Sequence, residues 1–314
     1  MQQFERSLAI APADNDGDLE AMIHVRRLVT PEARPTVDNL RFNLTSNHDL
    51  AYLVARVGEE PVACGYLEPH DAFAAADIAV VPRHRRRGAG SRMLAELSRR
   101  ARDLGKHELQ GEVKESDDAS RAFLERRGFR QVGAEKALAL SLDGHEPASL
   151  DPPEGVRIVS RVEEPDRLEG MYAVAVQADE DIPGSAGVQT FERWRAQEID
   201  KPSRRPQLCF IALAGDEVVG YAALQVFGDE AFHGLTATRR DWRRRGVASA
   251  LKRAEIHAAK EAGFRRLLTE SEERNEPMRR LNQKLGFVPA PEFSTLVMRG
   301  RPRSGAYDAV DGDH

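Results

Sequence analysis

Two short segments of the chain combine arginines with small residues in a pattern that suits a phosphate group. They read Arg85-Arg86-Arg87-Gly88-Ala89-Gly90-Ser91 and Arg243-Arg244-Arg245-Gly246-Val247-Ala248-Ser249. Each segment follows a predicted strand and leads into a predicted amphipathic helix, whose first N–H groups have no partner inside the helix. Glycine and alanine let the backbone approach a diphosphate closely, and arginines add charge-assisted hydrogen bonds. The pattern therefore predicts a pyrophosphate-binding turn in both places.

The two turns belong to an internal repeat. They lie 158 residues apart (243 − 85), and the pairs Gly128-Phe129 and Gly286-Phe287 keep the same separation (286 − 128). Two motifs held at one offset indicate a duplicated domain. In the hairpins that precede the turns, Gly65 and Gly220 lie 155 residues apart (220 − 65). From this spacing we expect about three more residues in the following loop of the first copy.

A stretch rich in Pro, Gly and Asp, at 143–155, separates the two copies and predicts a linker. A length of 314 residues also favours two domains over one. The predicted organisation is an N-terminal domain at 1–145, a linker at 146–153, a C-terminal domain at 154–303 and a disordered tail at 304–314.

The second copy alternates strand and helix patterns. Strands are expected at 156–160, 208–213, 218–226, 232–238, 265–270 and 294–299, and helices at 163–176, 191–198, 247–262 and 276–285. The first copy has the same order. Because strands separated by helices imply some parallel pairing, the predicted fold class is α+β, a mixed sheet flanked by helices in two tandem domains.

The arginine turns match competing binding motifs less well than a pyrophosphate site. Met93 and Leu251 stand where a dinucleotide fingerprint needs its third glycine, and no P-loop pattern is present. A solvated basic patch would account for one such segment better than for two. Nucleic-acid binding by 83–87 and 239–245 is a further alternative, but the net charge of −5 does not favour it.

The composition narrows the class of protein. No stretch approaches the length of an apolar membrane span, and the N-terminus does not have the pattern of a secretory signal. Cys64 and Cys209 each lie in an apolar, strand-like run, which favours small buried side chains over a metal site, a disulfide or a catalytic thiol. We expect a cytoplasmic protein without a metal, a membrane partner or a nucleic-acid partner.

Both copies resemble the GNAT superfamily of N-acetyltransferases. Its Q/R-x-x-G-x-G/A motif matches Arg85-x-x-Gly88-x-Gly90 and Arg243-x-x-Gly246-x-Ala248. Its later asparagine and helix end match Asn275 with LNQKLGF and, more loosely, Asp117 with FLERRGF. The doubled arrangement looks like mycothiol-synthase-like tandem acetyltransferases.

The resemblance implies acetyl-CoA as cofactor and direct acetyl transfer to a primary amine, with a sheet splayed at the strand before the turn. In the second copy it implies that pantetheine lies against Thr236, Ala237 and Thr238, pyrophosphate at 243–249, and that Asn275 also belongs to the cofactor site. In the first copy the corresponding positions are Val80, Val81 and 85–91.

The catalytic groups depart from the family pattern. The tyrosine that many members use as acid falls at Asn282 and Leu124, and neither can replace it. Asn282 could bind a sulfur or a water, or be an ordinary helix residue. His233 with Glu230 offers a base beside the strand end, and His233 could also be a satisfied strand histidine. These residues favour catalysis in the second copy, with the first copy binding cofactor only or serving as a structural partner.

The predicted function is acetylation of a small-molecule amine by a monomer or homodimer. The alternative from another class is a non-catalytic acyl-CoA-binding or interaction module, because neither copy has the tyrosine. The acceptor is expected to be selected by the loops at 30–48 and 179–198. The acidic run at 179–181 hints at a cationic amine, although a solvated loop would account for it as well.

Overall fold

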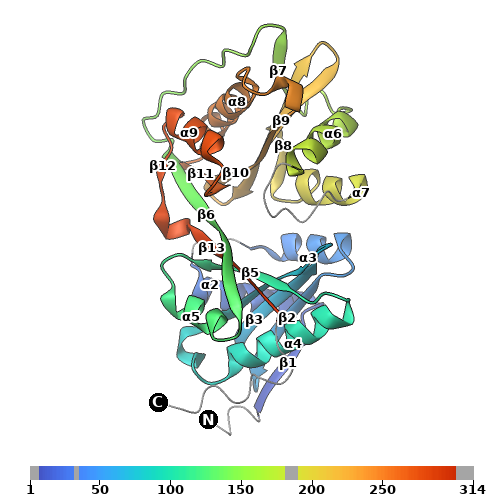
Figure 1. Ribbon diagram of the computed structural model, residues 1–314, viewed down its shortest axis with the longest axis vertical. Helices are drawn as coiled ribbons and strands as arrows, with labels where there is room; N and C mark the ends of the chain where they lie inside the picture. The colour runs from blue at the N-terminus through green and yellow to red at the C-terminus, as the bar shows by residue number, and fades with distance from the viewer. Residues whose placement is uncertain (1–6, 32–34, 181–189, 302–314) are drawn as a thin grey trace. The chain divides into compact units, whose positions relative to one another are not determined.

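A computed structural model describes residues 7–31, 35–180 and 190–301 of the chain (Figure 1). They form two compact units, Met1–Ala134 with Thr295–His314, and Glu135–Ser294. The predicted tail at 304–314 and residues 181–189 of the predicted acceptor loop lie outside the described residues. Within the described ranges, no helix is both long enough and apolar enough to cross a membrane.

The first unit is a mixed sheet with helices on both faces. Its strands, in sheet order, are β1 (Leu8–Pro12), β2 (Ala51–Val57), β3 (Glu60–Pro69), β4 (Ala74–Val80), β5 (Leu109–Lys114) and β13 (Thr295–Gly300). Its helices are α2 (Asp16–Val29), α3 (Val37–Ser46), α4 (Ala89–Asp103) and α5 (Asp118–Glu125). Because successive strand residues point to opposite faces, Leu53 packs with α4 residues while Val54 packs with α2 residues.

The second unit repeats this architecture. Its strands, in sheet order, are β6 (Phe129–Ser141, of which 135–141 belong to this unit), β11 (Arg266–Glu272), β10 (Glu230–Thr238), β9 (Glu217–Phe227), β8 (Arg204–Ala214) and β7 (Val156–Ser160), with β12 (Val288–Pro289) paired to β6. Its helices are α6 (Leu168–Asp179), α7 (Phe191–Trp194) with a π-turn at Arg195–Ile199, α8 (Val247–Glu261) and α9 (Glu276–Lys284). Figure 1 shows α8 and α9 on one face of this sheet and α6 and α7 on the other.

Helix α6 begins later than the sequence pattern predicts. The predicted start is residue 163, whereas the helix begins at Leu168. Glu163 instead accepts hydrogen bonds from the backbone N–H and the hydroxyl of Ser160, which holds the preceding residues in a turn. Pro165 follows in this turn, and the residue before a proline disfavours the helical conformation.

The two units exchange their last strands. Residues 135–141 of β6 pair antiparallel with β11, from Glu135 opposite Glu272 to Ser141 opposite Arg266. Strand β13 pairs antiparallel with β5, from Thr295 opposite Lys114 to Gly300 opposite Leu109. The predicted domains, 1–145 and 154–303, follow the order of the chain, whereas the compact units exchange these strands. Each repeat has an equivalent strand after its Gly-Phe pair, so either strand can complete either sheet.

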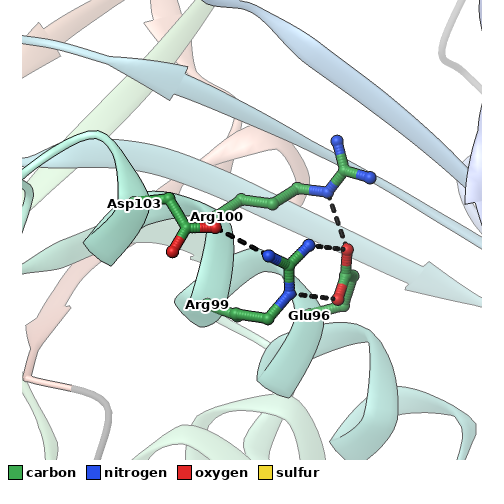
Figure 2. Close-up of polar contacts among 4 residues, drawn as sticks. All are labelled: Glu96, Arg99, Arg100 and Asp103. Carbon is green, nitrogen blue, oxygen red and sulfur yellow. Dashed lines mark hydrogen bonds and ion pairs between the residues drawn. The ribbon is translucent and has the colours of Figure 1, made fainter.

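The outer faces of α4 and α8 are covered differently. On α4, Glu96 accepts hydrogen bonds from Arg99 and Arg100, and Arg99 also binds Asp103 at 2.6 Å (Figure 2). These residues lie three and four positions apart, where helical side chains meet, and such surface ion pairs each contribute little stability.

On α8, the same face binds the segment that follows β6 within the second unit. Arg253 donates to the carbonyl oxygen of Ser149 at 3.0 Å, and His257 donates to that of Ala148 at 2.9 Å. Lys260 donates to the carbonyl oxygen of His145. The linker predicted at 146–153 therefore begins with residues that are hydrogen-bonded to α8.

Candidate active site

The two arginine–glycine turns have the same backbone conformation. Arg86 and Arg244 have φ of 60° and 61°, and Gly88 and Gly246 have φ of 86° and 94°. Two left-handed residues, two positions apart, bend the chain sharply just before each helix, and turns that aim successive backbone N–H groups inward form concave anion sites. Helices α4 and α8 start directly afterwards with no side-chain cap, so their first N–H groups are available to a ligand.

The first arginine of each motif forms a hydrogen bond between the turn and the strand before it. Arg85 Nε donates to the carbonyl oxygen of Val80 at 3.1 Å, and Arg243 Nε donates to that of Thr238 at 3.1 Å. The sequence predicted these arginines as phosphate ligands. In the structure their Nε atoms hold the turn in shape, which positions the backbone N–H groups for an anion.

The central strands separate just before each turn. Strands β10 and β11 pair in parallel only from Glu230–Phe232 to Arg266–Leu268, and β4 pairs with β5 only at Ala74 and Ala75. The splay that the resemblance implies is therefore present in both units. In the second unit the open end of the splay forms part of a pocket of about 1130 Å³.

Most of the predicted residues of the second copy line this pocket. They are His233, Thr236, Ala237, Thr238, Arg243, Arg244, Gly246, Val247, Ala248, Ser249 and Asn275. Asn275 also caps α9, where its side chain accepts a hydrogen bond from Met278 N at 3.3 Å. Arg245 is not part of the lining and stacks over Trp242, 4.9 Å from the ring centroid.

Several polar atoms in the pocket wall are buried without a hydrogen-bond partner. They are Thr236 Oγ1, Thr238 Oγ1, Ser271 Oγ and His233 Nε2. Unpartnered buried polar atoms are costly, so native sites that have them usually serve a ligand. A phosphate turn that continues into a slot with these donors and acceptors fits a long ligand with a phosphate end and amide groups along its chain.

His233 is held by a buried carboxylate. Its Nδ1 lies 2.6 Å from Glu255 Oε2, and both side chains are 0 % exposed. Burial, and then the nearby charge of Lys252, lower the pKa of His233, so the ring is neutral at neutral pH. Since the carboxylate accepts from Nδ1–H, the lone pair of the unpartnered Nε2 is free to accept a proton in the pocket.

A β-bulge in β10 shapes the pocket directly after His233. The pairing register with β9 shifts between His233 and Thr236, so Gly234 and Leu235 share one position opposite Ala223. Arg204 Nη1 donates to the carbonyl oxygen of Ala223 at 2.9 Å, which the bulge leaves without a strand partner. A Cβ at Gly234 would lie 2.6 Å from the Arg204 guanidinium, so a larger residue here would displace Arg204 from the carbonyl of Ala223.

The bulge also shows how the two repeats align residue by residue. The carbonyls of Val62 and Val219 accept the equivalent hydrogen bonds at the strand ends, and these residues are 157 apart (219 − 62). The turns are 158 apart, so the second copy has one more residue, inserted at the bulge. The expectation of about three additional residues in the first copy was wrong for two reasons. An offset that rises from 155 to 158 adds residues to the second copy, and Gly65 and Gly220 are not equivalent.

Two residues predicted as catalytic lie outside the pocket lining. Glu230, at the first residue of β10, forms an ion pair with Arg266. Asn282 is fully buried in α9, and neither polar atom of its side chain has a hydrogen-bond partner. Among the three residues predicted as catalytic, the structure places His233 in the pocket.

The corresponding turn of the first unit is covered by its own side chains. Arg127 Nη2 donates to the buried hydroxyl of Ser91 at 2.7 Å. The Arg127 guanidinium stacks on Phe123, 3.8 Å from the ring centroid, and the Phe123 ring lies 3.6 Å from where a Gly90 Cβ would be. Val81 is part of the core. These contacts place Arg127 and Phe123 directly beside the first residues of α4.

Neither cysteine has the environment of a nucleophile. Both are buried in the core. Burial raises the pKa of Cys64 to about 11 and that of Cys209 to about 12, so the thiolate is scarce at neutral pH.

The sequence analysis missed Lys252, Glu255 and Arg204, all of which shape the pocket. The repeat contained a signal for the first two. Lys252 and Glu255 lie on the inner face of α8 at positions that α4 fills with Leu94 and Leu97, 158 residues earlier (252 − 94). A charged pair within an otherwise apolar stripe marks a functional site. Nothing local marked Arg204, because its role depends on the bulge opposite.

Comparisons with known proteins agree with this fold. The model of the Acetyltransferase (GNAT) family matches residues 19–129 and 171–287. Among solved structures, a tandem GNAT protein from the clavulanic acid biosynthesis pathway is 21% identical, with a TM-score of 0.74 over 93% of this chain and 97% of that one. No curated protein matches.

Two further structures have the same fold. A GCN5-related N-acetyltransferase from Sphaerobacter thermophilus is 20% identical, with a TM-score of 0.73 over 95% of this chain and 97% of that one. The N-myristoyltransferase of Saccharomyces cerevisiae, solved with myristoyl-CoA, is 13% identical, with a TM-score of 0.69 over 94% of this chain and 78% of that one.

The fold and the paired turns define a tandem acyltransferase of the acyl-CoA-dependent class. The chain belongs to the GNAT acetyltransferase family, with one family domain matched in each half. The predicted fold class and the predicted family are confirmed.

Proposed function

We propose that the second unit transfers an acetyl group from acetyl-CoA directly to a primary amine of a small molecule. The observation that carries this proposal is His233, which has a buried, unpartnered Nε2 and belongs to the wall of a pocket that begins at the phosphate turn. A proton acceptor and a pyrophosphate site in one pocket are what direct amine acylation requires.

Different residues of the second unit bind different parts of acetyl-CoA along the pocket. The N–H groups at 244–249 bind the pyrophosphate, and the hydroxyls of Thr236, Thr238 and Ser271 bind the amide groups of the pantetheine arm. The bulge at Gly234 and Leu235 frees backbone groups of β10, which orient the thioester carbonyl. Acetyl-CoA supplies the activated acyl group.

The composition of the pocket wall suits a cationic acceptor. Its lining includes Trp194 and the carboxylates of Asp179, Glu198 and Glu270, and Glu198 is ion-paired with Arg204 at 2.8 Å. Carboxylates and an aromatic face favour a protonated amine. The amine loses a proton before it attacks, and His233 Nε2 is the acceptor for that proton. Glu255 holds the ring in place and stabilises the imidazolium that forms.

Turnover of the full chain tests this proposal. The protein is mixed with acetyl-CoA and a panel of primary amines, and CoA release is followed with a thiol reagent, while calorimetry measures CoA binding. We expect turnover with cationic amines, and turnover should be lost with their N-acetylated forms. CoA binding without turnover across the panel would favour the alternative, a non-catalytic acyl-CoA-binding module. The absence of CoA binding would overturn the proposal.

A further inference from the structure

Lys252 is a buried charge that packing does not require. It lies on the inner face of α8, is 1% exposed, and lines the pocket. The equivalent residue of α4 is Leu94, which belongs to the hydrophobic core of the first unit. A leucine is thus compatible with the fold at this position. An ammonium group there loses its hydration when it is buried, which costs free energy. A costly charge in a ligand pocket indicates a function for that charge.

The neighbours of Lys252 link it to His233. Glu255 follows one helical turn later, with one carboxylate oxygen on His233 and the other, Oε1, without a hydrogen-bond partner. The Phe287 ring centroid lies 6.0 Å from Lys252 Nζ and 5.4 Å from the His233 ring centroid. Lys252 and His233 therefore share one aromatic wall and one carboxylate neighbour at the closed end of the splay.

The two groups are in opposite protonation states at neutral pH. Burial lowers the pKa of Lys252 to about 8, although Glu255 raises it, so most of the side chain stays protonated. Burial lowers the pKa of His233, which is neutral. The titratable groups that act on Lys252 are Glu255 from α8 and His233 from β10, while β11 contributes the non-titrating Thr269 and Ser271 to the wall. One site thus holds an acid and a base.

Acyl transfer from a thioester needs such an acid. When the amine nitrogen bonds to the carbonyl carbon and the C–S bond breaks, the sulfur keeps the electron pair and leaves as a thiolate. The arginines of the pocket do not release protons, and Asn282 has none to give at neutral pH. Lys252 is the protonated group in the described wall of the pocket that can transfer a proton near neutral pH.

We propose that Lys252 is the catalytic acid that protonates the leaving thiolate. A cationic amine loses two protons when it becomes an amide. The first passes through His233 to solvent before the attack, His233 takes the second from the nitrogen as the C–N bond forms, and Lys252 delivers one to the sulfur as the C–S bond breaks, so one proton is released overall. The imidazolium then returns a proton to the neutral amine of Lys252, with Glu255 beside both, which restores the starting state. This inference rests on the proposed function, because it assumes that the second unit binds acyl-CoA.

The first experiment needs no acceptor and no turnover. CoA is bound to the full-length protein, and the ultraviolet absorbance of its thiolate is followed against pH. An ammonium near the sulfur favours the thiolate, so bound CoA should titrate below free CoA. In Lys252→Met the pKa of the bound thiol should rise by about one unit or more. Lys284→Met, an exposed position on α9, is the control and should match the wild-type protein.

The second experiment separates proton transfer from charge. With acetyl-CoA, Lys252→Met should lose about 100-fold in kcat, and Lys252→Arg should lose nearly as much because an arginine keeps its proton. With p-nitrophenyl acetate, whose leaving group needs no proton, both variants should keep wild-type rates. An unchanged thiol pKa in Lys252→Met with CoA bound, or full kcat in Lys252→Arg, would overturn the proposed role of Lys252. Neither result would contradict the proposed function. If wild-type protein does not bind CoA, the proposed function itself fails.

Discussion

The two units have different side chains at the same points of one fold. The positions of His233, Lys252 and Glu255 in the second unit are occupied in the first by Ala76, Leu94 and Leu97. In the first unit these positions are apolar, and both leucines belong to a hydrophobic core cluster. In the second unit the same positions hold three ionisable groups: His233 and Lys252 line the pocket, and Glu255 binds His233. The fold therefore accepts either apolar or ionisable side chains at these three positions, and a catalytic role accounts for the ionisable ones.

The central strands differ as well. Strand β4 pairs with β3 without a register shift, and its Asp77 forms an ion pair with Arg26 at 2.5 Å. In β10 the position of Asp77 is taken by two residues, Gly234 and Leu235, and the bulge frees backbone groups. An ion pair thus lies within the first unit where the second has an open slot. The comparison teaches that a phosphate turn is only one part of an acyl-CoA site.

The largest difference between the units should come from the turns themselves. Gly246→Val puts a branched side chain beside Pro153 at φ of 94°, which strains the turn that binds the pyrophosphate, and turnover should fall by about 1000-fold or more. Gly88→Val imposes the same backbone strain on the first unit and should leave most of the turnover. Initial rates of CoA release measure both. Loss with Gly88→Val and retention with Gly246→Val would reverse the assignment of the catalytic unit.

Removing the bulge should make the second unit behave like the first. Deletion of Leu235 leaves one residue of β10 opposite Ala223, as in β4, where Asp77 alone occupies this position and the pairing is continuous. The backbone groups that orient the thioester would be paired, so kcat should fall by about 100-fold. Circular dichroism would show whether the fold is kept. Full activity with a correctly folded deletion variant would mean that the bulge has no role in transfer.

Replacing His233 by the residue of the first unit tests the proposed base. His233→Ala should lower kcat/KM by about 100-fold at neutral pH, because the amine proton loses its acceptor. The loss should shrink at high pH, where more of the amine is already deprotonated. A pH–rate profile of variant and wild type measures this. An equal loss at every pH would assign His233 a structural role.

Lys252→Leu should lower the activity and raise the free energy of unfolding of the second unit. Since the pKa of Lys252 falls from its ordinary 10.5 to about 8, the unfolded chain binds the extra proton more tightly than the folded one. Wild-type stability should therefore rise as pH increases from about 8 to 10.5. The variant lacks this penalty, so its advantage, up to about 3 kcal/mol below pH 8, should shrink across that window.

Unfolding of the second unit can be followed separately. Both tryptophans, Trp194 and Trp242, lie within Glu135–Ser294, so denaturant unfolding monitored by their fluorescence reports on this unit. A stability difference between Lys252→Leu and wild type that does not change between pH 8 and 10.5 would contradict a lowered pKa.

The smallest effect on turnover is expected in the first unit. Arg127→Ala removes the hydrogen bond to Ser91 and the stacking on Phe123, and should destabilise the first unit by about 1–3 kcal/mol. Turnover should stay within about twofold, because the second unit carries the reaction. Hydrogen exchange of α4 amides measures the first effect, and CoA release the second. A large loss of turnover would show that the first unit takes part in catalysis.

Local sequence determined the features that depend on neighbouring residues. The Arg-x-x-Gly turn specifies its own shape, because only glycine adopts φ of 86° or 94° without strain and the first arginine reaches the carbonyl of the strand end five residues earlier. Helical periodicity placed α8 within one residue of its observed ends, and the doubled motifs identified the family.

Tertiary structure decided what depends on residues distant in sequence. Sequence order assigned β6 and β13 to their own repeats, but pairing energy is nearly the same for equivalent strands, so chain order does not determine the partner. Glu230 was close to His233 along β10, yet it pairs with Arg266, because alternate residues of a strand point to opposite faces. The partner of His233 is instead Glu255, 22 residues further along, which only the packing of α8 on the sheet brings within 2.6 Å.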